Sequence, residues 1–210
     1  MLKGCLYLAR RWWQRKRLLK QPFLDLPIVV IDLELTGLDA KQNEIVSAAW
    51  VKMEAGRIQL ASSAHLINAE VNDLAQSPIY HGICADDMQK GVPTKQLASA
   101  LAEVMHNAIV VFHHSYLDMA FIRVLFHQYQ YVGQPVLILD TMQIERKRLL
   151  SQGFELGQDS LTLDACRTRY GLPQYTGHHA LTDAVATAEL LLAQCHKIGQ
   201  LNELKFQRLV

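Results

Sequence analysis

The sequence has few cysteines, and none of them stands close to another. Among its 210 residues the four cysteines are Cys5, Cys84, Cys166 and Cys195, and no two form a C-x-x-C motif. A disulfide-stapled miniprotein carries a denser cysteine framework in a shorter chain, so that class is excluded. We predict reduced thiols in a cytoplasmic protein.

Long apolar runs and low-complexity segments are also missing. A bilayer-spanning helix takes about 20 consecutive apolar residues, and we therefore expect no transmembrane segment. The apolar stretch at residues 4–9 is short and leads directly into Arg10 and Arg11, which is not typical of a secretory signal. With 50% hydrophobic and 20% charged residues, the chain can form a sizeable core, which excludes a wholly disordered protein.

The net charge of +1 conceals a strongly basic start. Residues 1–20 contain seven lysines or arginines and no acid, whereas the remainder contains 14 basic and 20 acidic residues. We predict a basic, helical N-terminal extension at residues 1–24 and a single domain at residues 25–210. Three roles for the extension stay open. Trp12 and Trp13 could dock on the domain, the basic residues could contact nucleic acid, or the segment could attach to a membrane surface.

Hydrophobic patterning predicts alternating strands and helices. The β-branched run at residues 27–31 indicates a buried strand. Three early strands followed by helices that alternate with strands are typical of one α/β domain around a mixed sheet. The further strands are expected at 44–52, 56–66, 108–112 and 135–139, and the helices at 96–105, 117–128, 141–150, 161–170 and 180–196.

Two acidic residues follow the strongest predicted strand. Asp32 and Glu34 stand two positions apart directly after residue 31. Side chains at positions i and i+2 of a strand share one face, so these carboxylates would lie side by side. A divalent metal would relieve their mutual repulsion, and the alternative is a solvated strand end without a ligand.

Two further acids stand where helices are predicted to begin. Asp118 follows an apolar strand and a polar turn, and its position at a helix N-terminus would also suit a simple capping role. Asp183 is flanked by small residues, which leave room for a ligand or a close neighbour.

His178 stands five positions before Asp183. Within one helix, residues at that spacing are separated by roughly 140° and cannot converge. His178 can therefore act together with Asp183 only from the loop before the helix, which Gly177 makes easy to build. His179 competes with His178 for the same role.

These residues form three motifs in order along the chain: Asp32-x-Glu34-x-Thr36-Gly37, His113-x-Ser115-x-Leu117-Asp118 and His178-x-Ala180-x-x-Asp183. Together the motifs resemble those of the DEDDh 3′–5′ exonucleases, a family that includes the proofreading subunit of bacterial DNA polymerase III. The resemblance covers about residues 28–195. It implies an α/β, ribonuclease H-like fold in which helices flank a five-stranded mixed sheet. It also implies stepwise release of nucleoside 5′-monophosphates from a 3′ end.

Carried over residue by residue, the resemblance implies that Asp32, Glu34, Asp118 and Asp183 bind metal and that His178 is the general base. The implied cofactors are two Mg²⁺ or Mn²⁺ ions per site, and hard ions of this kind prefer oxygen ligands. One ion would lower the pKa of the attacking water, while the other would stabilise the leaving oxygen. A histidine near its ordinary pKa can accept the proton of that water.

Contacts with the terminal nucleotide are predicted for Thr36, Gly37, His81 and His113. This chain departs from the usual family pattern beside those positions. The departures affect the expected discrimination between sugars and the stacking on the terminal nucleotide more than the expected hydrolysis. The departures are Leu35 in place of threonine, His114 and Ser115 in place of Asn-Ala, and Leu117 in place of phenylalanine.

The function predicted from the sequence is a metal-dependent 3′–5′ exonuclease that acts on single-stranded DNA, with a polymerase or repair complex as a partner. Two alternatives stay open. The first is the same chemistry on RNA or short oligonucleotides, as in ribonuclease T or oligoribonuclease. The second is a nucleic-acid-binding module that keeps the fold without turnover.

Overall fold

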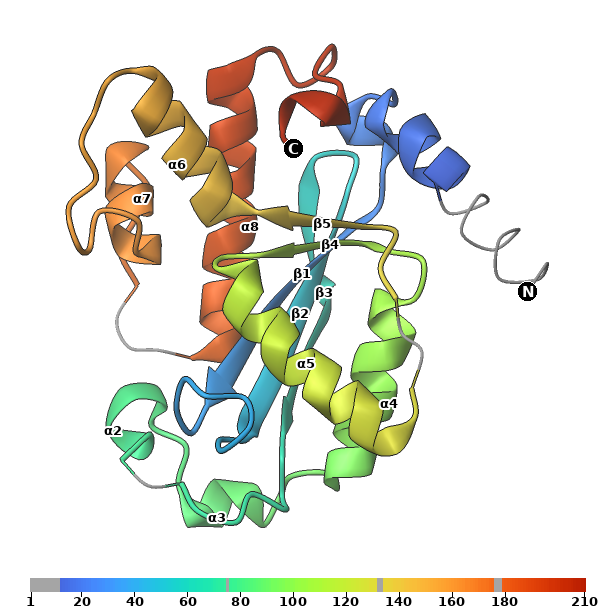
Figure 1. Cartoon of the computed structure of the whole chain (residues 1–210), viewed down its shortest axis with the longest axis vertical. Coiled ribbons are helices and arrows are strands. Elements are labelled where there is room, and N and C mark those ends of the chain that lie inside the picture. The colour runs from blue at the N-terminus through green and yellow to red at the C-terminus, as the bar shows by residue number, and fades with distance from the viewer. Residues whose placement is uncertain (1–11, 75, 132–133, 176–178) are drawn as a thin grey trace.

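The protein is described by a computed structural model over residues 12–74, 76–131, 134–175 and 179–210. A five-stranded sheet with the order β3-β2-β1-β4-β5 forms its centre (Figure 1). The strands are β1 (Ile28–Leu35), β2 (Ile45–Glu54), β3 (Arg57–Ile67), β4 (Ile109–Phe112) and β5 (Leu137–Asp140).

The sheet is mixed because its strands are joined in two different ways. β1, β2 and β3 follow one another as antiparallel hairpins, and Ala55 and Gly56 adopt the positive φ angles that the tight β2–β3 turn requires. β4 and β5 are each reached through a helix and pair in parallel, β4 with β1 and β5 with β4. The five-stranded mixed sheet predicted from the sequence is thus confirmed.

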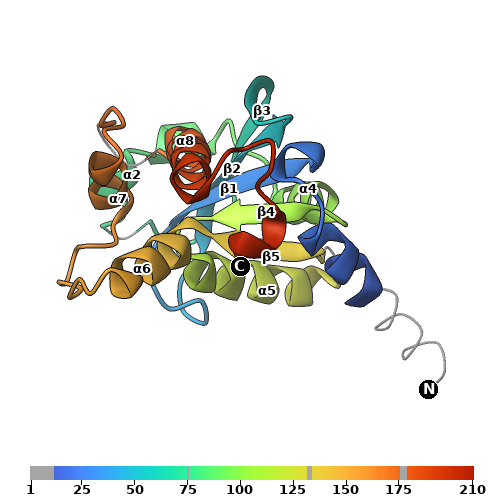
Figure 2. The same ribbon diagram turned by 90° about the horizontal axis from the view of Figure 1, so that it is seen from above.

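Helices cover both faces of the sheet. α4 (Thr94–Met105) and α5 (Ser115–Tyr129) pack on one face, and α8 (Ala180–Ile198) packs on the other, with α6 (Thr141–Ser151) and α7 (Leu163–Arg169) beside it. Figure 2 shows α8 and α5 separated by the strands. Two single-turn helices, α2 (Pro78–His81) and α3 (Ala85–Met88), lie between β3 and α4 and were not predicted. Within the described residues, no helix combines the length and the apolar character that crossing a membrane would take.

Each face of the sheet has its own apolar core, and β1 contributes to both. Ile28 and Val30 are buried in the cluster that includes α8, whereas Val29, Ile31 and Leu33 are buried in the cluster that includes α4 and α5. This alternation follows from the period of two residues in a strand. Burial of each such side chain stabilises the fold by roughly 1.5–3 kcal/mol before entropy is counted.

The basic N-terminal segment is helical over residues 12–19, but its tryptophans do not dock. Trp12 and Trp13 are 50% and 67% exposed, while Leu18 and Leu19 pack against the α8-side core. Docking through the tryptophans is therefore the one alternative for this segment that the structure contradicts.

The chain that follows this helix is part of the core. Phe23 is 1% exposed and stacks on Phe206 with ring centroids 6.3 Å apart, and its amide donates to the carbonyl of Leu204 at 2.7 Å. The segments near both termini consequently meet at one end of the molecule (Figures 1 and 2). The division into an extension at 1–24 and a domain at 25–210 stays a prediction, with Phe23 packed as a core residue.

Candidate active site

Asp32 and Glu34 lie near the carboxyl end of β1 on the face covered by α8. They continue the register of Ile28 and Val30, so the alternation that buries those residues also places both carboxylates beneath α8. β4 pairs with β1 only as far as Val30, which is opposite Val111. The two acids therefore extend past the paired part of β4, at the edge where parallel strands of an α/β sheet form their sites.

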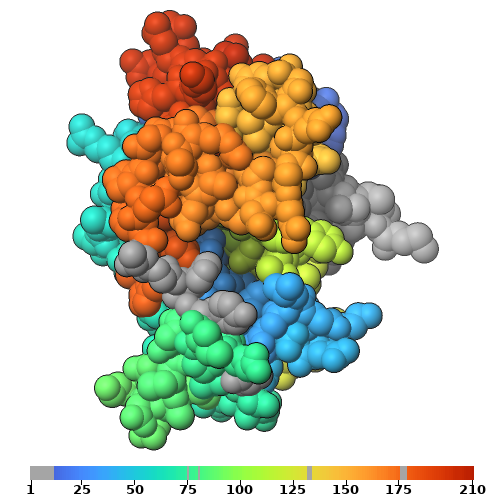
Figure 3. All heavy atoms as spheres, turned by 90° about the vertical axis from the view of Figure 1, so that its left-hand side faces the viewer, coloured from blue at the N-terminus to red at the C-terminus, as the bar shows by residue number. Residues whose placement is uncertain are grey.

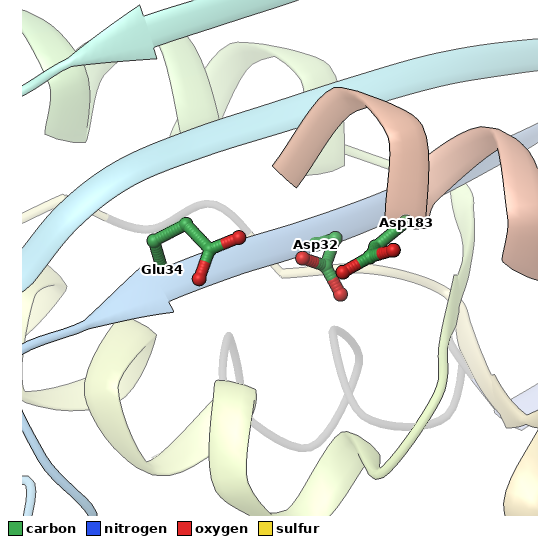
Figure 4. Close-up of side chains that lie close together, drawn as sticks. All are labelled: Asp32, Glu34 and Asp183. Atoms are coloured by element: carbon green, nitrogen blue, oxygen red, sulfur yellow. The ribbon is translucent and has the colours of Figure 1, made fainter. Parts of the chain in front are cut away.

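Asp183 lies in the first turn of α8 and forms a cluster of three carboxylates with Asp32 and Glu34. One oxygen each of Asp32, Glu34 and Asp183 lie within 4.8 Å of one another. Figure 4 shows Asp32 and Glu34 on the same side of β1, with Asp183 reaching down from α8. The amide of Asp183 donates to the carbonyl of His179 at 2.9 Å, which fixes the start of the helix above the strand.

Asp118, in the first turn of α5, is a buried acid close enough to this cluster to act on Asp32 electrostatically. Its side chain is 7% exposed, and its charge helps to raise the pKa of Asp32. Among the described residues it is not part of the group whose oxygens meet within 4.8 Å. The structure therefore brings Asp32, Glu34 and Asp183 together, with Asp118 as a buried neighbour that acts on them electrostatically.

Burial and mutual repulsion raise the pKa values of Asp32 and Glu34 in this cluster. Burial, followed by the charges of Asp118, Asp183 and Glu34, raises the pKa of Asp32 well above its ordinary value. The pKa of Glu34 rises to about 7, mainly through burial and then through the charge of Asp183. Such a site binds a cation favourably, because a positive charge removes the repulsion that raises these pKa values.

The donor set fits a divalent metal ion. All the side chains of the cluster offer carboxylate oxygens, which are the ligands preferred by hard ions such as Mg²⁺ and Mn²⁺. Glu34 Oε1 is buried and accepts no hydrogen bond from the described part of the chain. A buried anionic oxygen without a donor is costly, so Glu34 is suited to a metal ion as its partner.

His178, the predicted general base, lies outside the described residues. Its neighbour His179 occupies the N-cap position of α8, makes no side-chain capping hydrogen bond there, and is exposed. The ring of His179 packs edge-on against the ring of His65 on β3, with centroids 4.7 Å apart. Asp32 pairs with Ala49 on β2, and Ala49 pairs with His65 on β3, so these three residues form one row across the sheet. The contact with His65 therefore places His179 at the row that carries Asp32.

Thr36 and Gly37, two of the predicted nucleotide contacts, shape the loop after β1. The hydroxyl of Thr36 accepts a hydrogen bond from the amide of Glu44 at 2.9 Å, and the amide of Thr36 donates to the carbonyl of Glu44. A Cβ on Gly37 would stand 2.6 Å from Oδ1 of Asn43, so a larger residue there would require the Asn43 side chain to move. Both residues hold this loop beside Glu34.

His81 and His113, the other predicted nucleotide contacts, differ in how their rings are engaged. His81 is 5% exposed and its Nδ1 accepts from the amide of Ile83, so the proton is on Nε2, which has no partner among the described residues. His113 uses both nitrogens, with Nδ1 2.8 Å from Thr141 Oγ1 and Nε2 2.9 Å from the carbonyl of Leu161. Burial lowers the pKa of both imidazoles.

Asp140 is a supporting residue for which the sequence analysis predicted no role. At the end of β5 it accepts hydrogen bonds from the amide and hydroxyl of Ser115 and from the amide of His114, and also from two amides that begin α6. It thereby fixes the turn that leads to Asp118. An acid directly between an apolar strand and a helix is typical of an N-cap residue. The neighbouring sequence does not indicate that Asp140 also bonds to His114 and Ser115.

The chain matches a known protein family and is similar in sequence to two bacterial DNA polymerases. The model of the RNase_T family, described as "Exonuclease", matches residues 29–191. The chain is 24% identical over 171 residues to the PolC-type DNA polymerase III of Thermotoga maritima, and 28% identical over 194 residues to that of Streptococcus sanguinis. These matches cover 81% and 86% of this chain, which spans only 12% of the length of either relative.

Solved structures with the same fold include two exonucleases I. The enzyme from Methylocaldum szegediense superposes with a TM-score of 0.69 at 16% identity, covering 84% of this chain and 42% of that one. The E. coli enzyme in complex with a dT13 oligonucleotide gives a TM-score of 0.66 at 12% identity, covering 80% and 40%. At these identities the similarity establishes the ribonuclease H-like fold alone.

Proposed function

This chain belongs to the exonuclease family whose model spans its residues 29–191, and from that membership we propose that it is a 3′–5′ exonuclease that releases nucleoside 5′-monophosphates. The observation that carries the proposal is the convergence of Asp32, Glu34 and Asp183 within 4.8 Å, with buried Asp118 beside them. Four carboxylates gathered in this way would repel a phosphodiester unless cations were bound between them.

In this proposal, Asp32, Glu34, Asp118 and Asp183 hold two Mg²⁺ or Mn²⁺ ions. The ions, when bound, acidify the attacking water and stabilise the negative charge that develops on the leaving 3′ oxygen. The protein supplies the fixed frame: β1 carries two ligands in one register, and α5 and α8 bring one each from their first turns. The raised pKa values of Asp32 and Glu34 mean that protons compete with metal, so metal binding should strengthen as the pH rises.

His178 is proposed as the general base that accepts the proton of the attacking water. Support comes from its neighbour His179, which occupies the N-cap position of α8 one turn before Asp183 and packs against His65. His178 directly precedes His179 in the sequence.

Single-stranded DNA is the proposed substrate, with a polymerase or repair complex in the cytoplasm as the setting. The relatives named above are DNA polymerases, and one structural neighbour is an exonuclease captured with a dT13 oligonucleotide.

The direct test is the digestion of matched single strands of DNA and RNA, each labelled at the 5′ end, with Mg²⁺, with Mn²⁺ and with a chelator. We expect a ladder that shortens from the 3′ end, 5′-mononucleotides as the product, faster loss of DNA than of RNA, and no reaction with the chelator. Asp118→Asn is the control that separates this nuclease from a contaminant, because it removes one proposed metal ligand and should leave a folded, inactive protein.

Each alternative result has a distinct meaning. Faster loss of RNA would assign the same chemistry to ribonucleotide substrates. Binding of either strand without any product, with both metal ions, would support a non-catalytic module. Activity that persists in Asp118→Asn would contradict the proposed ligand set.

A further inference from the structure

The N-terminal helix over residues 12–19 presents tryptophans and positive charges to solvent, and the proposed chemistry uses none of them. Trp12 and Trp13 are 50% and 67% exposed. Residues 15–17, an arginine, a lysine and an arginine, are exposed as well, and no acid of the described residues forms an ion pair with them. The first acid in the sequence is Asp25. Within the described structure, the positive charge of this helix is therefore not compensated.

Aromatic rings and positive charges alternate on the exposed side of this helix. Lys16 stands four positions after Trp12, and Arg17 stands four positions after Trp13, so each base shares a helix face with one ring. Nζ of Lys16 lies 3.9 Å from the centroid of the Trp12 ring, and the two tryptophan rings meet edge to face with their centroids 5.1 Å apart. These four side chains form one mixed surface, which we call the tryptophan–basic surface.

The mixture decides which ligand this surface fits. A helix that lies in a membrane interface buries an apolar face that is separate from its charged face. In this helix the purely apolar residues are Leu18 and Leu19, and both pack against the α8-side core. The exposed rings, by contrast, each stand beside a positive charge. Single-stranded nucleic acid matches such a surface, because every nucleotide offers both a base that stacks on an aromatic ring and a phosphate that pairs with a cation.

The tryptophan–basic surface and the carboxylate cluster lie at opposite ends of β1. The helix precedes the amino end of β1, whereas the cluster lies near its carboxyl end, and the strand spans about 20 Å between Ile28 and Glu34. In Figure 1 the helix is at the upper right of the molecule. Figure 3 looks from the opposite side, onto α7 and the loop after β1 below it. One nucleotide therefore cannot contact both places.

We propose that Trp12, Trp13, Lys16 and Arg17 form a second contact for single-stranded DNA, which holds a part of the strand away from its 3′ end. This inference rests on the proposed function, because the strand is the substrate of the carboxylate cluster. The rings stack on bases and the two cations neutralise phosphates, so the contact supplies affinity without selecting a base sequence.

The first experiment measures the affinity for a labelled 20-nucleotide oligothymidylate by fluorescence anisotropy, in a chelator so that no strand is digested. Trp12→Ala combined with Trp13→Ala should weaken binding at least fivefold, the lower limit for the loss of one stacked base. A strand of the same length and charge that lacks bases should bind the wild type at least fivefold more weakly than the oligothymidylate. The double variant should bind both strands about equally, because the rings that distinguish them are gone.

The second experiment measures how the affinity depends on salt. Lys16→Gln combined with Arg17→Gln should reduce the slope of log affinity against log salt concentration by about 1.4, because each phosphate contact on a single strand contributes about 0.7. Lys95→Gln combined with Arg123→Gln is the matched control, since it removes the same two charges from exposed positions on α4 and α5. This control should leave the slope unchanged.

Each contrary outcome has one meaning. Equal affinity of the wild type and the tryptophan variant for the oligothymidylate would overturn the inference, as would an equal loss of slope in the control, which would reveal an effect of net charge alone. Co-sedimentation with vesicles of phosphatidylcholine and phosphatidylserine that requires Trp12 and Trp13, without any effect of these residues on DNA, would assign the surface to a membrane.

Binding without digestion also separates this inference from the proposed function. An active nuclease whose DNA affinity is indifferent to the tryptophan–basic surface would overturn the inference alone. A protein that binds DNA through this surface but digests no strand with Mg²⁺ or Mn²⁺ would overturn the exonuclease proposal and leave the contact standing.

Discussion

The carboxylate of Asp183 on α8 lies within 4.8 Å of the carboxylate of Asp32 on β1, although the two residues are 151 positions apart in the sequence. Burial raises the pKa of Asp32 most, and the charges of neighbouring carboxylates, Asp183 among them, raise it further. The fold thus holds like charges together at a point where their repulsion works against stability. Retaining such a pair is understandable if the site exists to bind cations.

Removing one of these charges should stabilise the metal-free protein. We expect Asp183→Asn to raise the melting temperature in the presence of a chelator by a few degrees, because about 1 kcal/mol shifts the midpoint of a domain of this size by roughly 2–4 °C. The increase that Mg²⁺ confers on the wild type should be lost at the same time. Thermal scans with and without Mg²⁺ measure both effects. Asp159→Asn, an exposed change outside the cluster, is the control.

The raised pKa of Glu34 predicts how stability depends on pH without metal. Its pKa is about 7 in the folded protein, against an ordinary value of 4.5 that applies to the unfolded chain. Between these pH values the carboxyl group of Glu34 binds a proton in the folded state more strongly than in the unfolded state. Stability should therefore fall as the pH rises from about 4.5 to 7, by at most roughly 3 kcal/mol from this group. Urea denaturation at several pH values tests this. Glu34→Gln should flatten that part of the curve, and an unchanged slope would contradict the prediction.

Asp140 should matter for stability. Asp140→Ala removes the acceptor for donors from the turn before α5 and from the start of α6, and we expect a loss of about 3 kcal/mol in the free energy of unfolding. Asp39→Ala is the matched control, because Asp39 accepts one amide hydrogen bond in an exposed loop and should cost less than about 1 kcal/mol. Denaturant titration measures both, and equal losses would argue against the bridging role of Asp140.

The close approach at Gly37 makes the loop after β1 intolerant of a side chain. In Gly37→Ala the new methyl group would meet the amide group of Asn43, whose Oδ1 already accepts from the amide of Asp39. We expect activity to fall at least tenfold and stability to drop by about 1–2 kcal/mol. Gly157→Ala, where no atom lies within 4 Å of the added Cβ, should behave as the wild type.

The N-terminal helix should be held by its leucines. Trp12→Ala and Trp13→Ala should leave the free energy of unfolding unchanged within about 0.5 kcal/mol, because both rings are half-exposed or more. Leu18→Ala should cost about 1–2 kcal/mol, because this side chain packs on the core. Chemical denaturation distinguishes them, and a large effect of the tryptophans would mean that they contact the body in solution.

Much of the architecture could be predicted from local pattern. The β-branched run before Asp32, the period of two residues in the strands and the alternation of strands with helices predicted the mixed five-stranded sheet, with most boundaries within a few residues. The i, i+2 spacing also placed Asp32 and Glu34 on one face. The short helices α2 and α3 escaped prediction, because single turns carry too few residues to show a helical period.

The sequence by itself predicted which residues carry the chemistry, from acids at strand ends and helix starts whose motifs resemble those of a known family. Only the tertiary structure decided that Asp183 faces Asp32 and that Asp140 ties two helix starts together. These contacts join residues that are distant along the chain. Their energies depend on burial and on neighbouring charge, which exist only once α8 has packed on the sheet.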